Sequence, residues 1–198
     1  MSALFVTPVG PVENDLLFEL CGSISILPGL DLRQCRLEVG DIQEYAYDSK
    51  RCQYSSTLIL RRLLLLVPDE GIRLLAVTEL DLFIPMLTFV FGQAQLDGRA
   101  AIISLARLRQ EFYSLPPNRT LLINRAAKEA MHELGHTFGV THCELSDCPM
   151  SLSTTLQQVD SKGLTYCGNC GNAVSIALRQ SATAHFKLKT GTLTSLEK

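Results

Sequence analysis

The first half of the chain alternates short apolar runs with helix-like segments and contains no internal repeat. An apolar run over residues 4–9 predicts a strand, and leucines at near-helical spacing after Pro11 predict a helix. Residues 35–42 predict a second strand. Over residues 49–66, leucines that alternate with arginines and serines predict a partly buried helix.

Three short runs rich in apolar or β-branched residues follow, over residues 72–83, 89–95 and 100–105. Asp97-Gly98 separates the last two runs and predicts a β-hairpin. Together with the preceding segments, these runs predict an α/β fold with a sheet of about five strands and two or three helices.

The most regular helical pattern covers about residues 120–138, and Asn118 is placed to cap its N-terminus. Apolar residues at spacings of three and four form one stripe along this helix. At about 100° per residue, His132 and His136 lie about half a turn from the centre of the stripe, so they point away from the main packing face. The stripe consists of Ile123, Ala127, Ala130, Met131, Leu134 and Phe138.

The composition changes after Gly139. Residues 142–170 show little periodicity and many Cys, Ser, Thr and Asp residues, which predicts a loop-rich segment that needs a stabilising cross-link. A helix is possible over residues 173–186, and we expect the polar tail after it to be poorly ordered unless it docks. We therefore expect one domain in three parts, which are an upper subdomain (1–139), a lower subdomain (140–170) and a C-terminal tail (171–198).

The sequence HELGHTFGVTHC, which begins at His132, carries the clearest chemical signal. His132 and His136 are four residues apart on a helix, so their imidazoles can converge on one ion with Zn–N distances of about 2.0–2.1 Å. Glu133 is rotated by about 100° and lies where a general base is needed, beside a metal-activated water. Gly139 can adopt a positive φ that ends the helix, so His142 can return as a third ligand.

Three neutral imidazoles leave the fourth position of a tetrahedral zinc ion open, which is typical of a catalytic site. With Glu133 as the general base, such a site would hydrolyse a peptide or protein substrate. The substrate could lie extended along an edge strand at about residues 89–94. Two alternatives remain, namely ordinary polar residues on an exposed helix and a catalytically inactive zinc-binding interaction module.

Cysteines are the unusual feature of the composition, because there are seven of them and four lie close together. Cys143 and Cys148 form one close pair, and Cys167 and Cys170 form a Cys-x-x-Cys pair, which is the spacing of a structural zinc site with four thiolate ligands. Cys143 directly follows His142, so this second ion would also anchor the third histidine. The alternatives are two disulfides and a redox-active Cys-x-x-Cys motif.

The charge balance excludes some partners. Lys and Arg number 18 against 20 Asp and Glu, a formal net charge of -2, which argues against a nucleic-acid or anionic-membrane surface. The most apolar stretch is far shorter than the roughly 20 residues of a membrane span. The odd cysteine number and the absence of a recognisable secretory leader predict a cytoplasmic protein with no nucleic-acid or membrane partner. The sequence gives no indication of an oligomeric state.

The extended motif, with its glycine and third histidine, is the metzincin signature. Its continuation into Cys143, CPM from Cys148, and CGNC from Cys167 resembles the archaemetzincins. Upstream, TELDLFIP, FVFGQA and SLARL resemble strand segments of that family, so the resemblance covers roughly residues 40–170. It implies a metzincin-like fold: a mixed, mostly parallel twisted sheet with backing helices, an active-site helix and a small zinc-stapled C-terminal subdomain.

The resemblance also implies a zinc metalloprotease with two zinc ions per chain, one catalytic and one structural. Met150 is the implied Met-turn residue beneath the catalytic zinc, and Glu133 the implied base. The implied zinc ligands are His132, His136 and His142 at the catalytic ion, and Cys143, Cys148, Cys167 and Cys170 at the structural ion.

Overall fold

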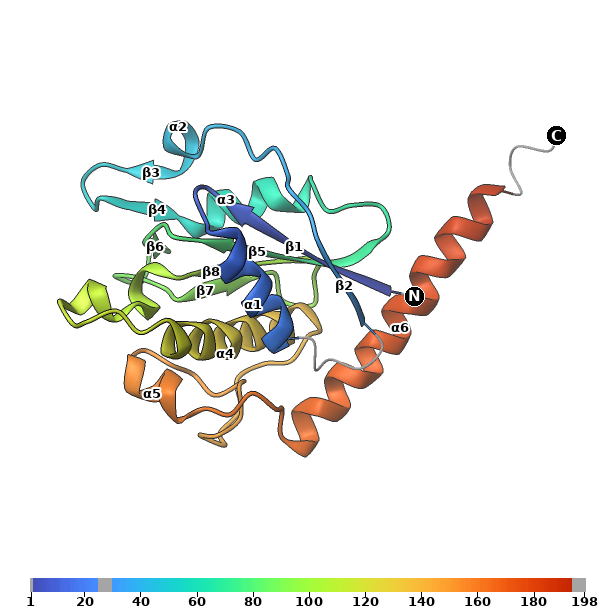
Figure 1. Cartoon of the computed structure of the whole chain (residues 1–198). Coiled ribbons are helices and arrows are strands. Elements are labelled where there is room, and N and C mark those ends of the chain that lie inside the picture. Colours follow the sequence, from blue (N-terminus) through green and yellow to red (C-terminus); the bar gives the residue numbers. More distant parts are fainter. Residues whose placement is uncertain (1, 25–29, 194–198) are drawn as a thin grey trace.

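The fold is built on a mostly parallel sheet with helices on both faces (Figure 1). The computed structural model describes residues 2–24 and 30–193, except for the side chains of residues 2, 182 and 184–193. The main sheet consists of β1 (Ser2–Val9), β2 (Leu30–Gln34), β5 (Gly71–Thr78), β7 (Gly92–Ala94) and β8 (Ala100–Ser104). Within the described residues its order is β2-β1-β5-β8-β7, and the β7–β8 hairpin is its antiparallel pair.

Different helices pack against the two faces of this sheet. α1 (Asn14–Ile24) and α4 (Arg119–Thr137) cover one face, and α3 (Ser56–Leu64) covers the other. Successive side chains of a strand point to opposite faces of the sheet. Leu4 therefore packs with α1 and α4, whereas Phe5 packs with α3. Burial on both faces explains why the strands read as almost continuous apolar runs.

The predicted second strand over residues 35–42 is wrong. The strand is β2, five residues earlier, and it is parallel to β1 with Ser2 opposite Leu30. Pairing ends where the N–H of Cys35 donates to the carbonyl of Val6 at 2.9 Å, and residues 35–41 have no regular structure. Pairing with β1 determines which residues form the strand, and the apolar pattern alone does not reveal that pairing.

The helix predicted over residues 49–66 begins later than expected, because a hairpin precedes it. The hairpin joins β3 (Tyr47–Asp48) to β4 (Gln53–Ser55), and the Asp48 carboxylate accepts two backbone hydrogen bonds in its turn. β4 also pairs with β6 (Leu82–Phe83) in a second, three-stranded sheet. The sequence analysis did not predict this sheet, whose strands are only two or three residues long.

The prediction for the helix at 120–138 is confirmed as α4. The Asn118 side chain accepts a hydrogen bond from the N–H of Leu121 at 2.9 Å and caps the helix as expected. All six residues of the predicted apolar stripe are buried in the core. Packing of that stripe against the sheet fixes the rotation of α4 and thereby the direction of its polar side chains.

The C-terminal part contains more helix than the sequence predicted. It contains α5 (Leu156–Ser161) and α6 (Gly168–Leu193). Elsewhere among the described residues there are a short helix, α2 (Ile42–Ala46), and two 3-10 helices, η1 (Ala106–Leu108) and η2 (Gln110–Tyr113). Residues 187–193 continue α6 beyond the helix that the sequence predicted, while residues 194–198 lie outside the described part. No proline interrupts α6, and its C-terminal half extends beyond the body of the molecule (Figure 1). Among the described residues, no helix has the length and apolar character to cross a bilayer.

Candidate metal centres

Three histidines converge at the C-terminal end of α4. The imidazole rings of His132 and His136 have their centroids 4.6 Å apart. Gly139 has a φ of 80°, as the motif predicted, and the turn there brings the ring of His142 to 5.3 and 5.1 Å from the other two. The nitrogen atoms available for a metal ion all lie within 4.8 Å of one another. The structure therefore brings together the three histidines selected from the sequence.

Backbone carbonyls fix the orientation of two of these rings. His132 Nδ1 lies 2.8 Å from the Pro149 carbonyl oxygen, and His136 Nδ1 lies 2.7 Å from that of Val140. Because a carbonyl only accepts, each Nδ1 carries the proton and each Nε2 keeps a free lone pair. The two Nε2 atoms are only 3.1 Å apart. Two lone pairs this close repel unless a cation lies between them, so the donor set fits a zinc ion.

The four cysteines selected from the sequence also form one cluster. Their sulfur atoms lie within 4.8 Å of one another, with Cys143 Sγ and Cys167 Sγ 3.9 Å apart. A tetrahedral ion with Zn–S bonds of about 2.3 Å separates its sulfurs by about 3.8 Å, so this set also fits zinc. All seven cysteines are free thiols in the structure. A backbone hydrogen bond from Cys170 lowers the pKa of Cys167 to about 7 and favours the thiolate that zinc binds.

Met150 lies under α4, against the turn that carries His136. Its side chain is fully buried, and a Cβ on Gly135 would collide with its sulfur. The carbonyl of Met150 also accepts a hydrogen bond from the N–H of Cys143 at 2.9 Å. Met150 therefore joins the turn of α4 that precedes His136 to the segment that carries Cys143.

Glu133 has two ionisable neighbours that the sequence analysis missed. Glu129, one turn earlier on α4, and Lys162, after α5, are both buried beside it. Burial raises the pKa of Glu133 well above its ordinary value, and the carboxylate of Glu129 raises it further, whereas the Lys162 ammonium lowers it. The four-residue spacing of the two glutamates was a usable signal on a predicted helix. Nothing in the local sequence indicated Lys162, which reaches the site through the tertiary fold.

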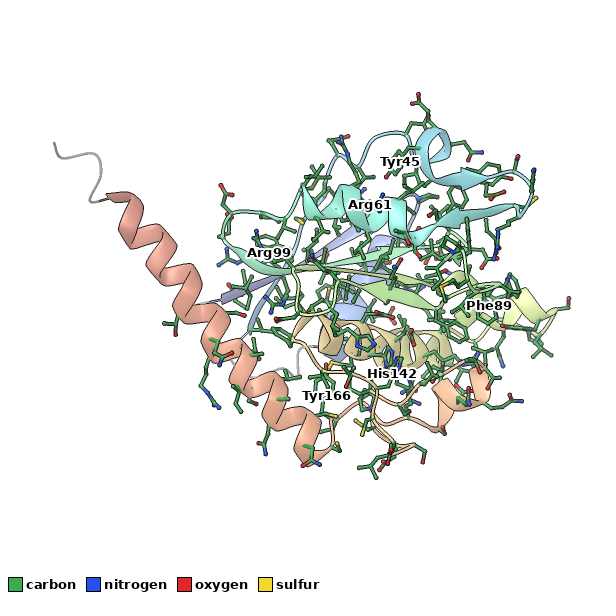
Figure 2. The ribbon with its side chains drawn as sticks, turned by 180° about the vertical axis from the view of Figure 1, so that it is seen from behind. Tyr45, Arg61, Phe89, Arg99, His142 and Tyr166 are labelled. Atoms are coloured by element: carbon green, nitrogen blue, oxygen red, sulfur yellow. The ribbon has the colours of Figure 1, made fainter. Side chains whose placement is uncertain are left out.

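A groove of about 410 Å³ runs past the histidines. Residues 87–94, which include β7, line it from the sheet, and residues 152–154 line it from the segment below α4 (Figure 1). Figure 2 shows His142 beside α4, with Phe89 on the side of the sheet. Glu129 and Glu133 also contribute to its surface. The histidine cluster and Glu133 are therefore open to a ligand as long as a short peptide.

Acid should destabilise the metal-free protein through His132. Burial, and then the Lys162 ammonium, lower the pKa of His132 from 6.5 to about 2. Between these values the unfolded chain binds a proton that the folded chain does not, so stability falls as the pH falls below about 6.5. One such group costs about 1.4 kcal/mol per pH unit. We expect urea unfolding of the metal-free proteins at pH 6, 5.5 and 5 to show this slope as the difference between the wild type and a His132→Gln variant.

A His132→Gln variant provides the comparison for this prediction. The raised pKa values of Glu129 and Glu133 oppose the trend. The lowered pKa values of His136 and His142 add to it. Only the difference between variant and wild type therefore isolates His132. Identical pH slopes for the two proteins would show that His132 is protonated in the folded state.

Comparison with known proteins agrees with this geometry. Residues 36–175 match the family model described as peptidase family M54. The chain belongs to peptidase family M54. The archaemetzincin of Methanocaldococcus jannaschii is 44% identical over 172 residues, which are 83% of this chain and 88% of that protein. The resemblance to archaemetzincins stated from the sequence is thus confirmed.

Two solved structures share the fold. The archaemetzincin of Methanopyrus kandleri superposes with a TM-score of 0.77 at 34% identity, over 90% of this chain and 96% of that one. A zinc-dependent peptidase of Methanocorpusculum labreanum gives a TM-score of 0.78 at 26% identity, over 86% and 99% of the two chains. This M54 chain is a zinc metallopeptidase with the mixed, mostly parallel sheet of the archaemetzincins.

Proposed function

We propose that this M54 peptidase hydrolyses peptide bonds at a zinc ion bound by His132, His136 and His142, with Glu133 as the general base. The observation that supports this proposal is the convergence of three histidines beside a buried glutamate in an accessible groove. When bound, zinc would supply a Lewis acid that polarises the scissile carbonyl and acidifies a water molecule. The fixed tautomers of His132 and His136 present their Nε2 atoms for this purpose.

Glu133 would move the proton in this reaction. Its carboxylate accepts a proton from the attacking water, and the resulting carboxylic acid donates that proton to the nitrogen of the leaving amine. Its raised pKa suits the first step, because a carboxylate whose acid form has a higher pKa is a stronger base. The Lys162 ammonium opposes the rise and favours the ionised form from which the reaction starts.

We also propose that Cys143, Cys148, Cys167 and Cys170 bind a second, structural zinc ion. All four side chains would be ligands, which leaves no position for a water molecule and makes the site structural. On this basis residues 1–139 and 140–170 form upper and lower subdomains that flank the groove, and Met150 is the Met-turn residue beneath the catalytic ion.

The proposed binding site of the substrate lies along β7, at the edge of the main sheet. The carbonyl of Phe91 and the N–H of Gln95 form hydrogen bonds to β8, at 2.7 and 3.0 Å. In an antiparallel ladder successive residues direct their N–H and C=O groups to opposite sides, so Gly92 and Ala94 direct theirs away from β8. An extended peptide could pair with these groups as an added strand and pass directly over Glu133.

Cleavage of a peptide library by the zinc-loaded chain tests the proposed function. We expect products whose new ends show hydrolysis of peptide bonds, loss of cleavage with a zinc chelator and recovery when zinc is restored. Peptides that carry N-methyl groups on the amides flanking a cleaved bond should be poor substrates, because they cannot complete the ladder with β7. No cleavage by protein with full zinc content would contradict the proposal.

A further inference from the structure

The edge strand comes unusually close to the side chain of Glu133. A Cβ built on Gly92 would lie 2.6 Å from Glu133 Cγ, 2.9 Å from its Cδ and 2.7 Å from its Oε1. Non-bonded carbon atoms have their optimal separation at about 3.5–4.0 Å, so no side chain fits between β7 and this glutamate. Glu133 is itself buried, with 4% of its surface exposed, so it cannot swing aside without displacing other groups of the core.

The backbone conformation does not explain a glycine at this position. Gly10, Gly40 and Gly139 have a positive φ, whereas Gly92 does not. A residue with a side chain could therefore adopt the backbone conformation of β7 at this point. Glycine in a strand also weakens it, because glycine has more conformational freedom to lose and no side chain to pack. The space taken by Glu133 is thus the feature that requires glycine here.

We propose that Gly92 is a positioning residue for the reaction, because the absence of a side chain lets the edge strand confine the Glu133 carboxylate beside the histidine cluster. The inference rests on the proposed role of Glu133 as base. Ala94 faces the same side of the strand and has a Cβ, so the requirement is specific to the residue above Glu133. Gly92 thereby has two roles, since its backbone faces the proposed substrate and its missing side chain leaves room for the base.

The kinetic test is a Gly92→Ala variant of the zinc-loaded chain. The added methyl points toward Glu133 and not toward the open strand edge, so we expect kcat to fall by about 10- to 100-fold with an unchanged KM. Zinc content should equal that of the wild type. Gly22→Ala is the matched control, because it adds the same methyl where nothing lies within 4 Å, and it should leave both constants unchanged. A raised KM with unchanged kcat, or unchanged values of both, would overturn the proposal.

A stability cycle tests the same contact without any substrate. Gly92→Ala should lower the midpoint of thermal unfolding in the wild-type background and leave it unchanged in a Glu133→Ala background, where the crowding side chain is gone. If Gly92→Ala alone fails to fold while the double variant folds, the contact is supported. An equal loss in both backgrounds would overturn it. Should the wild type cleave no peptide, the proposed function fails, while this cycle still decides whether Gly92 and Glu133 exclude a side chain between them.

Discussion

A Glu133→Gln variant is expected to lose peptidase activity by roughly 10²- to 10⁴-fold, the range typical of a general base. Glutamine has nearly the same size as glutamate, so it fits under Gly92 and keeps the packing of α4. Its amide cannot accept the proton of the attacking water at neutral pH. Glu133 does not belong to the histidine cluster, so the variant should bind as much zinc as the wild type. The measurement is kcat/KM for one peptide substrate at equal zinc content.

Glu129→Gln is the matched control, since it makes the same change one turn earlier on α4. It should retain most of the activity at neutral pH. Because the Glu129 carboxylate raises the pKa of Glu133, its removal lowers that pKa, and the acid limb of the activity profile should move to lower pH. A larger loss of activity in Glu129→Gln than in Glu133→Gln would instead indicate that Glu129 is the base. A loss of activity of less than about tenfold in Glu133→Gln would show that Glu133 is not the general base.

The parts of the site that could be predicted from sequence are those that local geometry determines. His132, Glu133 and His136 occupy consecutive turns of one helix, and the rotation of about 100° per residue fixes their relative directions once the apolar stripe is identified. Gly139 ends that helix through a local backbone preference, which its φ of 80° bears out. Local sequence also predicts parts of the fold. The β7–β8 hairpin and the cap at Asn118 could be predicted because both depend on residues close together in the sequence.

The features that the sequence did not reveal depend on contacts between distant segments. Lys162 approaches Glu133 from the segment after α5, and Gly92 approaches it from the sheet, although each is separated from it by tens of residues. β2 was misplaced for the same reason, since strand pairing and not the apolar pattern selects its residues. An isolated glycine inside a strand pattern, as in FVFGQA, is nevertheless a sign of close backbone approach and could have pointed to Gly92.

The cysteine cluster should decide whether the segment below α4 folds at all. A Cys167→Ser variant is expected to bind one zinc ion per chain instead of two and to lose nearly all peptidase activity. Residues 142–170 bury few large apolar side chains, among them Met150 and Val159, so packing alone contributes little to their stability. Binding of structural zinc is worth about 10–16 kcal/mol in small domains, which is comparable to the whole stability of a typical domain. His142 directly precedes Cys143, so disorder of the segment would also displace a proposed ligand of the catalytic zinc.

Cys52→Ser separates this effect from the general loss of a thiol. Cys52 is exposed and lies outside the cluster, so its replacement should leave both zinc content and activity unchanged. In Cys167→Ser, limited proteolysis should cut within residues 142–170 while the sheet and α4 resist, because most buried residues of the two apolar clusters belong to the sheet and to α1, α3 and α4. Retention of two zinc ions and of full activity in Cys167→Ser would show that the four thiols do not bind a structural metal. Cuts throughout the chain would show that the second zinc stabilises the whole domain, and the lower subdomain would then not be a separate unit.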